Sequence, residues 1–249
     1  MASTRLKTNP TKSEYLWCAT ARRHHHIDIS TFRLADGDVV PTTYVLNVGA
    51  YSDASMSMAT HVNRLVSTCF YQLRRVRAIL RSTPTSTAVQ LINSFVISRI
   101  DYCSSLLAGL PAYQLNRVQS ILNISARLIY GRAKYYHVTR MLQDKLQWLR
   151  VPERIQYNSC LLVYKYLLGL APSYISNFCI RVQLSDRRSS LRSATRSHNK
   201  LVVPRSNTFD EGSFTISGPS IWISLPDTSY QPHLLTLSKI DLKLICLLV

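Results

Sequence analysis

Acidic residues are scarce in this 249-residue chain, which has 13 Asp and Glu against 30 Lys and Arg and a net charge of +17. Carboxylates this thinly spread offer no pair for general acid–base or two-metal catalysis. Glycine is also scarce, with 7 residues, and no G-x-S-x-G elbow, phosphate-binding loop or dinucleotide-binding glycine pattern occurs. The sequence therefore gives no independent argument for an enzyme.

The six cysteines lie far apart and form no C-x-x-C pair and no Cys/His set with zinc spacing, which excludes a zinc knuckle. No apolar run reaches the ~18 residues that a membrane span needs, because Lys165 interrupts the best one, Cys160 to Ala171. We find no secretory signal pattern ahead of the cysteines. We therefore expect reduced, buried thiols in an intracellular protein, nuclear or cytoplasmic, that is not secreted and does not enter a membrane.

Two short motifs could suggest a metal site, and neither supports one. His24, His25 and His26 are consecutive, so they point in different directions and cannot all coordinate one ion. The run Tyr51-Ser52-Asp53-Ala54 is faintly similar to a polymerase Tyr-x-Asp-Asp turn, but Ala54 stands where the second carboxylate would be. We predict no bound metal and no cofactor.

The positive charge is concentrated in the middle of the chain. Residues 54–209 carry 22 basic and 4 acidic groups, and 18 of the basic residues are Arg. The planar guanidinium suits phosphate recognition, so this segment favours a nucleic-acid partner. The apolar content of 46% is enough to build a core and argues against wholesale disorder.

Hydrophobic periodicity predicts a mainly α fold in three regions. Residues 1–55 have the content of short strands and turns, with strands at Tyr15–Cys18 and Thr43–Val48. Residues 56–180 show helical spacing of apolar residues in four stretches: from Thr60 to the break before Ser82, from Thr85 to Ile100, from Leu115 to Ile129, and from Pro152 to Leu167. Residues 181–249 are predicted to be a Ser/Arg-rich loop and a small irregular or β C-terminal segment, with short strands at Leu201–Pro204 and Phe214–Ile216.

Arginines gather on the polar half of the first predicted helix. Arg74, Arg77 and Arg81 recur at i, i+3 and i+7, with Arg64 and Arg75 beside them. Such cations could follow the phosphates of a nucleic acid, although a solvated helix face gives the same pattern. The charge of the whole middle segment favours binding.

A second candidate site is the stretch in which tyrosines alternate with cations. It contains Tyr130, Tyr135 and Tyr136 among Arg127, Arg132 and Lys134. This mixture can stack bases while it neutralises phosphates, whereas a single Tyr more often belongs to a core or its rim. Gly131 is placed to end the preceding helix in the left-handed conformation.

Several ordered motifs resemble one family. The chain runs Ser98-Arg99-Ile100-Asp101-Tyr102-Cys103, continuing to Gly109-Leu110-Pro111. Upstream, Asn9 to Glu14 is similar to the late-palm motif Asn-x-x-Lys-Thr-Glu, and Val48-Gly49-Ala50 with Asp53 is similar to a Leu-Gly-Val-x-x-Asp segment. Downstream lie Leu115 to Ser120, Ser125 to Ile129, Gly169 to Tyr174, Leu201 to Arg205 and Gly218 to Trp222. Together they resemble non-LTR retrotransposon (LINE) reverse transcriptases of the chicken-repeat and Jockey-like kind.

The resemblance implies RNA-directed DNA synthesis by the intact enzyme, with Mg²⁺ on palm aspartates that this chain does not contain. Residues 1–55 would be a late-palm remnant and residues 56–180 a helical thumb that holds RNA or an RNA/DNA template–primer. Lys12 matches the late-palm lysine, which has no reaction to assist without the metal site. We therefore expect a truncated fragment that is inactive alone and retains at most nucleic-acid binding.

Departures from the family pattern leave two other hypotheses open. Ser13 replaces Thr, Ala50 replaces Val, and Ile223 replaces a usual Asn. A decaying element of this kind could have become a host-retained protein-interaction module, in which the charge only maintains solubility. It could also be a relic without a selected function.

Overall fold

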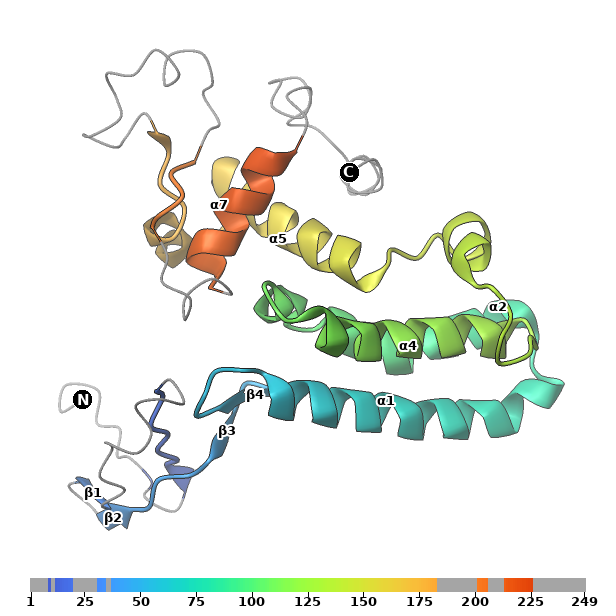
Figure 1. Ribbon diagram of the computed structural model, residues 1–249, viewed down its shortest axis with the longest axis horizontal. Coiled ribbons are helices and arrows are strands. Elements are labelled where there is room, and N and C mark those ends of the chain that lie inside the picture. Colours follow the sequence, from blue (N-terminus) through green and yellow to red (C-terminus); the bar gives the residue numbers. More distant parts are fainter. Residues whose placement is uncertain are drawn as a thin grey trace. The chain divides into compact units, whose positions relative to one another are not determined.

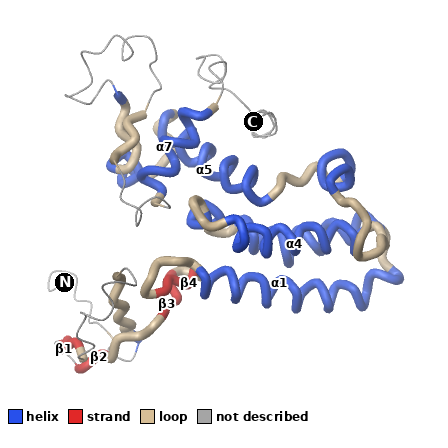
Figure 2. The backbone as a smooth tube through the Cα atoms, in the orientation of Figure 1, coloured by secondary structure: helices blue, strands red, loops and turns tan. Residues whose placement is uncertain are grey.

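The computed structural model describes residues 9, 12–19, 31–34, 37–182, 201–205 and 213–225 (Figures 1 and 2). The fold is mainly helical, with a few short strands ahead of the helices, as the sequence predicts. The chain divides into two compact units, Met1–Ser67 and Thr68–Val249, and the division falls inside helix α1 (Ala59–Ile79). The boundary between the two units therefore lies between Ser67 and Thr68, not near residue 55 as the sequence predicts.

The strands of the first unit form two antiparallel hairpins. Strand β1 (Phe32–Leu34) pairs with β2 (Gly37–Val39), and β3 (Tyr44–Asn47) pairs with β4 (Ala50–Asp53). Val48 and Gly49 connect β3 to β4, both with positive φ, 45° and 84°, which is the geometry of a type I′ hairpin turn. The β3 prediction is confirmed.

The predicted strand Tyr15–Cys18 is wrong. Tyr15 makes one isolated parallel bridge to Pro41, and the backbone N–H of Thr42 donates to the Tyr15 carbonyl at 2.8 Å. The Tyr15 ring stacks on Phe32, with ring centroids 5.0 Å apart, and meets the edge of Trp17 at 5.2 Å. The aromatic side chains of this segment thus pack against one another, and its backbone does not form a paired β-strand.

Asp53 shapes the turn that leads from β4 into α1. Its Oδ1 accepts the backbone N–H of Ser57 at 2.7 Å, and its Oδ2 accepts the Ser57 hydroxyl at 2.9 Å. Ser57 Oγ in turn accepts the Ala59 N–H at 3.3 Å. Asp53 Oδ1 also accepts the Ser55 hydroxyl at 3.2 Å, so the buried carboxylate organises the turn that precedes the long helix.

In the second unit, the predicted helix from Thr85 to Ile100 is present but contains a wide turn. It consists of α2 (Thr85–Ile92), a π-helical turn η5 (Asn93–Ile97) and α3 (Ser98–Asp101). Phe95 is 45% exposed, while Val96 and Ile97 are buried. The extra residue in the π turn changes which side chains face the core.

Helix α4 (Ala112–Ile129) packs against α2 and α5 and buries the stripe that its spacing predicts. Val118, Ile121 and Leu122 have no exposed surface. Short 3₁₀ turns complete this part of the unit at Leu80–Ser82 (η4) and Ser104–Leu107 (η6), and a second π turn lies at Met141–Lys145 (η7).

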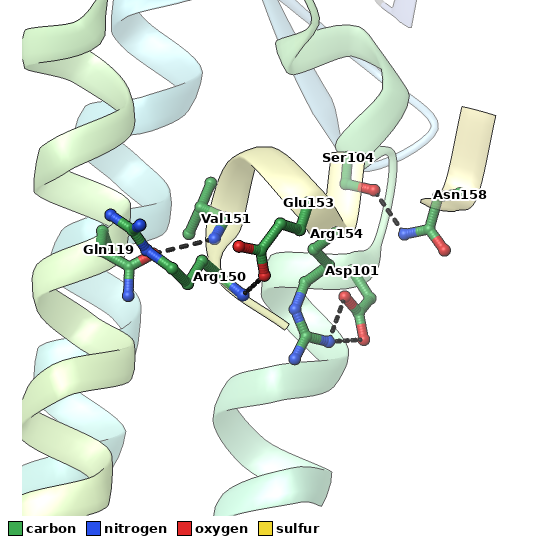
Figure 3. Close-up of polar contacts among 8 residues, drawn as sticks. All are labelled: Asp101, Ser104, Gln119, Arg150, Val151, Glu153, Arg154 and Asn158. Carbon is green, nitrogen blue, oxygen red and sulfur yellow. Dashed lines mark hydrogen bonds and ion pairs between the residues drawn. The ribbon is translucent and has the colours of Figure 1, made fainter. Parts of the chain in front are cut away.

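Helix α5 (Val151–Leu167) begins with Pro152 in its first turn, as predicted, and polar contacts fix this end (Figure 3). The Arg150 N–H donates to Glu153 Oε2 at 2.9 Å, and the Val151 N–H donates to Gln119 Oε1 of α4 at 2.8 Å. These bonds satisfy donors that a helix start otherwise leaves unpaired.

Two further contacts join α5 to the segment before α4. Arg154 Nη1 lies 2.8 Å from both carboxylate oxygens of Asp101, and Asn158 Nδ2 donates to Ser104 Oγ at 2.7 Å (Figure 3). Their partners are 53 and 54 residues away in the sequence. The register of α5 on its neighbours is thus set by polar pairs as well as by apolar packing.

The predicted strand at Phe214–Ile216 is wrong, because these residues begin helix α7 (Phe214–Ser224). Helix α7 packs against α5 (Figure 1). Its Trp222 is 2% exposed. Leu201, in the other predicted strand, makes one antiparallel bridge to Arg181. The shared core consists of Cys160, Val163, Tyr164, Ile175, Cys179, Leu201, Trp222 and Leu225.

This core changes the predicted division at residue 180. Ile175 lies in the 3₁₀ turn η8 (Ser173–Asn177), so residues on both sides of the expected boundary pack into one cluster. The predicted C-terminal segment is therefore helical and joined to α5 over the part that the structure describes. Residues 183–200, most of the predicted Ser/Arg-rich loop, and residues 226–249 lie outside the described residues.

Candidate nucleic-acid interface

Positive charge dominates residues 54–143, all of which the structure describes. This stretch holds eleven Lys and Arg and a single acidic residue, Asp101. Arg154 pairs with both oxygens of that carboxylate, and the side chains of Arg154 and Asp101 are 11% and 38% exposed. The one acidic group of the stretch is thus neutralised from α5, and the basic groups are left to set its potential.

The predicted arginines of α1 in the second unit are exposed. Arg74, Arg75 and Arg77 face solvent, while Leu73 just before them and Val76 among them are buried. The Arg75 guanidinium lies 5.8 Å from the centre of the Tyr71 ring. Arg74 and Arg77, three residues apart, share one face of the helix and can contact neighbouring phosphates, while Arg75 lies on the flank of that face. The backbone of Arg81 lies in η4, and its side chain lies outside the described residues.

Arg64 belongs to the first unit and packs on the β3–β4 hairpin. Its guanidinium carbon lies 5.8 Å from the Tyr44 ring centre and 5.4 Å from that of Tyr51, and Nη2 donates to the Tyr44 hydroxyl at 3.4 Å. The two rings meet at 63°, edge to face. These contacts give Arg64 a packing role that its position in the helical pattern does not predict.

The loop that follows α4, residues 130–137, is the second predicted site, and we call it the tyrosine loop. Helix α4 ends in a Schellman motif: the Gly131 N–H donates to the Leu128 carbonyl at 3.4 Å and the Arg132 N–H to the Arg127 carbonyl at 2.9 Å. Gly131 has φ +59°, which confirms the predicted left-handed helix end. All seven residues from Gly131 to His137 are exposed.

Each tyrosine of this loop has a cation against its ring. Lys145 Nζ lies 5.1 Å from the Tyr130 ring centre, Lys134 Nζ lies 5.6 Å from that of Tyr135, and Arg132 Cζ lies 5.1 Å from that of Tyr136. Attraction between a cation and the ring face holds such pairs together. The mixture of tyrosines and cations expected from the sequence is therefore a spatial cluster.

Two residues of the cluster show what sequence spacing cannot predict. Arg127, predicted to contact nucleic acid, uses its Nε to donate to the Tyr136 carbonyl at 3.1 Å and so holds the loop closed. Lys145 was not predicted, because it lies 15 residues after Tyr130 and reaches the ring from the π turn η7. No local pattern signals that contact.

Lys12, the residue matching the late-palm lysine, is exposed in the first unit. Its backbone N–H donates to the Asn9 carbonyl at 3.1 Å, and the Ser13 hydroxyl donates to the same carbonyl at 2.9 Å. These bonds make a turn at the motif Asn-x-x-Lys. Among the residues that the structure describes, no three His, Cys, Asp or Glu side chains gather in a way that could hold a metal ion.

Comparison of the chain with protein-family models, curated proteins and solved structures finds no match. Over the described part of the chain, none of the helices combines the length and the apolar character needed to cross a bilayer.

Proposed function

We propose that this chain binds nucleic acid, RNA or an RNA/DNA template–primer, through the basic surface of its helical unit. In this proposal it is the late-palm and thumb portion of a LINE-type reverse transcriptase, and it does not polymerise on its own. The observation that carries the proposal is the charge of residues 68–143 of the second unit: ten cations and one carboxylate, which Arg154 neutralises. A surface of this kind attracts phosphates without reading sequence.

The exposed arginines of α1 support contact with the backbone rather than with bases. Arg74, Arg75 and Arg77 project from a long regular helix whose opposite side is buried. Their forked donors match phosphate oxygens in geometry as well as in charge. We therefore expect affinity that falls steeply with salt and varies little with sequence.

A salt titration tests the proposal. The purified chain is titrated into a labelled blunt RNA/DNA duplex at several salt concentrations, and the slope of log K against log salt is compared with about −0.9 per neutralised phosphate for duplex DNA. We expect a slope of several units that becomes shallower in Arg74→Glu plus Arg77→Glu. Lys165→Glu plus Arg205→Glu is the matched control, because it makes the same charge change at two other exposed residues.

Absence of duplex binding by a folded sample would contradict the proposal, as would equal loss in the control variant. Primer extension by the chain alone with added Mg²⁺ would overturn its expected inactivity. Circular dichroism without a helical signal would instead favour a poorly folded relic.

A second candidate function, a protein-interaction module, is favoured by apolar side chains exposed near the α5–α7 core. Leu170 is 72% exposed, Tyr174 is 63% exposed, and Phe178 is 41% exposed. Exposed apolar groups gathered in one region often mark protein contacts. Under this alternative, charge reversal at Arg74 and Arg77 would leave partner binding intact.

A further inference from the structure

We propose that the tyrosine loop, residues 130–137, is a stacking site for unpaired nucleotides of RNA, with the Tyr135 ring as the platform for a base. This inference rests on the proposed nucleic-acid binding and adds the class of ligand, a single-stranded segment. It concerns the end of α4 and not the arginines of α1.

The exposure of Tyr135 is the first observation. Its side chain is 86% exposed, and Tyr136 beside it is 46% exposed, whereas Tyr164 in the core is 9% exposed. An aromatic ring left in water gives up the free energy of burial unless a partner covers it. Lys134 Nζ lies over the Tyr135 ring at 5.6 Å from its centre, and the rest of this ring is open to a planar group that arrives from solvent.

The fixed shape of the loop is the second observation. The Tyr136 N–H donates to the Ala133 carbonyl at 3.1 Å, which closes a turn with Lys134 and Tyr135 at its centre. Arg127 holds the Tyr136 carbonyl from the other side, and the Schellman motif fixes Arg132. A platform that is already ordered loses little entropy when a base stacks on it.

The charge around the rings is the third observation. Lys134, Arg132 and Lys145 each lie within 5.6 Å of a tyrosine ring centre. No acidic residue occurs from Tyr102 to Gln143, a stretch that the structure describes throughout. Asp144 is exposed beside Lys145 in η7, so a nucleotide that stacks on Tyr135 has its phosphates near three cations and one carboxylate.

Unpaired nucleotides fit this site better than a duplex does. Inside a duplex each base is stacked between its neighbours, so only the end pairs have a face free to lie on a tyrosine. In a single strand the bases can be splayed apart, and aromatic rings hold them whatever their identity. The loop would thus bind unpaired nucleotides, while the α1 arginines bind paired ones.

The test uses fluorescence anisotropy with labelled 12-nucleotide oligo(U) and with a blunt RNA/DNA duplex. We expect Tyr135→Ala to weaken oligo(U) binding about 10-fold and to leave duplex binding unchanged. Tyr135→Phe keeps the ring and should retain the affinity. Tyr174→Ala, which removes another exposed tyrosine, is the matched control and should have no effect.

Salt dependence separates stacking from charge. Tyr135→Ala should leave the salt slope for oligo(U) unchanged because it removes no cation, whereas Lys134→Ala should reduce the slope by about 0.7. A merely structural role of Tyr135 in the loop would change both quantities together.

Three outcomes would overturn the inference. Oligo(U) binding could be equal in Tyr135→Ala and the unmodified chain, Tyr135→Phe could lose as much affinity as the Ala variant, or anionic phosphatidylserine vesicles could bind at Tyr135 while oligo(U) does not. If the duplex binds with a steep salt slope and Tyr135→Ala has no effect on oligo(U), only this inference fails. If neither probe binds, the proposed function fails with it.

Discussion

Removing the carboxylate of Asp101 should destabilise the second unit, because it leaves the nearly buried guanidinium of Arg154 without a counter-ion. Arg154 Nη1 lies 2.8 Å from both Asp101 oxygens, and its side chain is 11% exposed. Arg154 Nε is buried and has no hydrogen-bond partner. In Asp101→Ala the guanidinium would stay in this nearly dry position without its counter-ion.

The size of the effect follows from burial. Breaking a fully buried ion pair by deleting one partner costs about 3–5 kcal/mol. The Asp101 side chain is 38% exposed, so water screens part of the interaction. We therefore expect a loss of about 2 kcal/mol in the free energy of unfolding. With a urea m-value of about 2 kcal/mol/M, the midpoint should fall by about 1 M.

Urea unfolding followed by tryptophan fluorescence measures this loss. Trp148 and Trp222 are buried in the second unit, and a Trp17→Phe background removes the signal of the first unit. The double change Asp101→Leu plus Arg154→Met should lie within about 1 kcal/mol of the unmodified chain, because an apolar pair replaces the charges. Asp144→Asn, which neutralises an exposed carboxylate of the same unit, is the control.

Two results would refute this reasoning. One is an Asp101→Ala variant within about 0.5 kcal/mol of the unmodified chain, the range of ordinary surface changes. The other is a double variant as unstable as the sum of its single changes, since that would mean that the two side chains act independently.

Three further predictions test burial and packing elsewhere. Burial raises the pKa of the Cys69 and Cys179 thiols to about 11, and the charge of Arg99 opposes this rise for Cys69 only. About one thiol in a thousand is then ionised at pH 8, so iodoacetamide should alkylate the exposed Cys18 long before Cys69 or Cys179, as followed by mass spectrometry. Burial lowers the pKa of His61, so near pH 6.5 the unfolded chain binds a proton at this side chain while the folded chain keeps the imidazole neutral. The first unit should therefore lose stability as the pH falls below about 6.5. Urea unfolding followed by Trp17 fluorescence should show this loss, and His61→Phe should reduce it. A Cβ at Gly218 would lie 2.9 Å from Phe214 Cε2 in α7, so Gly218→Ala should lower the free energy of unfolding by about 1–3 kcal/mol in thermal or urea unfolding. An unchanged free energy of unfolding would show that the Phe214 ring moves aside freely.

The helices of the second unit are predictable from sequence because each carries its own boundary signals. Pro84 and Pro111 precede helix starts, Pro152 lies in the first turn of α5, and Gly131 and Gly169 follow helix ends with φ of +59° and +71°. These signals act within a few residues, so no tertiary knowledge is needed to use them. Apolar spacing between them then identifies the buried side of each helix.

Helix α7 could not be predicted in the same way. Its sequence, Phe214 to Ser224, mixes apolar residues with Ser and Thr without a helical stripe, includes Gly218, and has Pro219 in its interior, where proline removes a backbone donor. The β-branched Thr215 and Ile216 favour a strand. Packing of Trp222 into the core shared with α5 outweighs these local preferences, and such packing lies beyond any short window of sequence.

The candidate site was predictable in composition but not in arrangement. Counting charges identifies a basic segment, and spacing identifies the Arg74–Arg77 face, because both are local properties. The contacts that decide what each cation can do join distant residues: Lys145 reaches Tyr130, and Arg154 reaches Asp101. The second contact links the fold to the proposed function, since the ion pair that fixes α5 also neutralises the one carboxylate among residues 54–143.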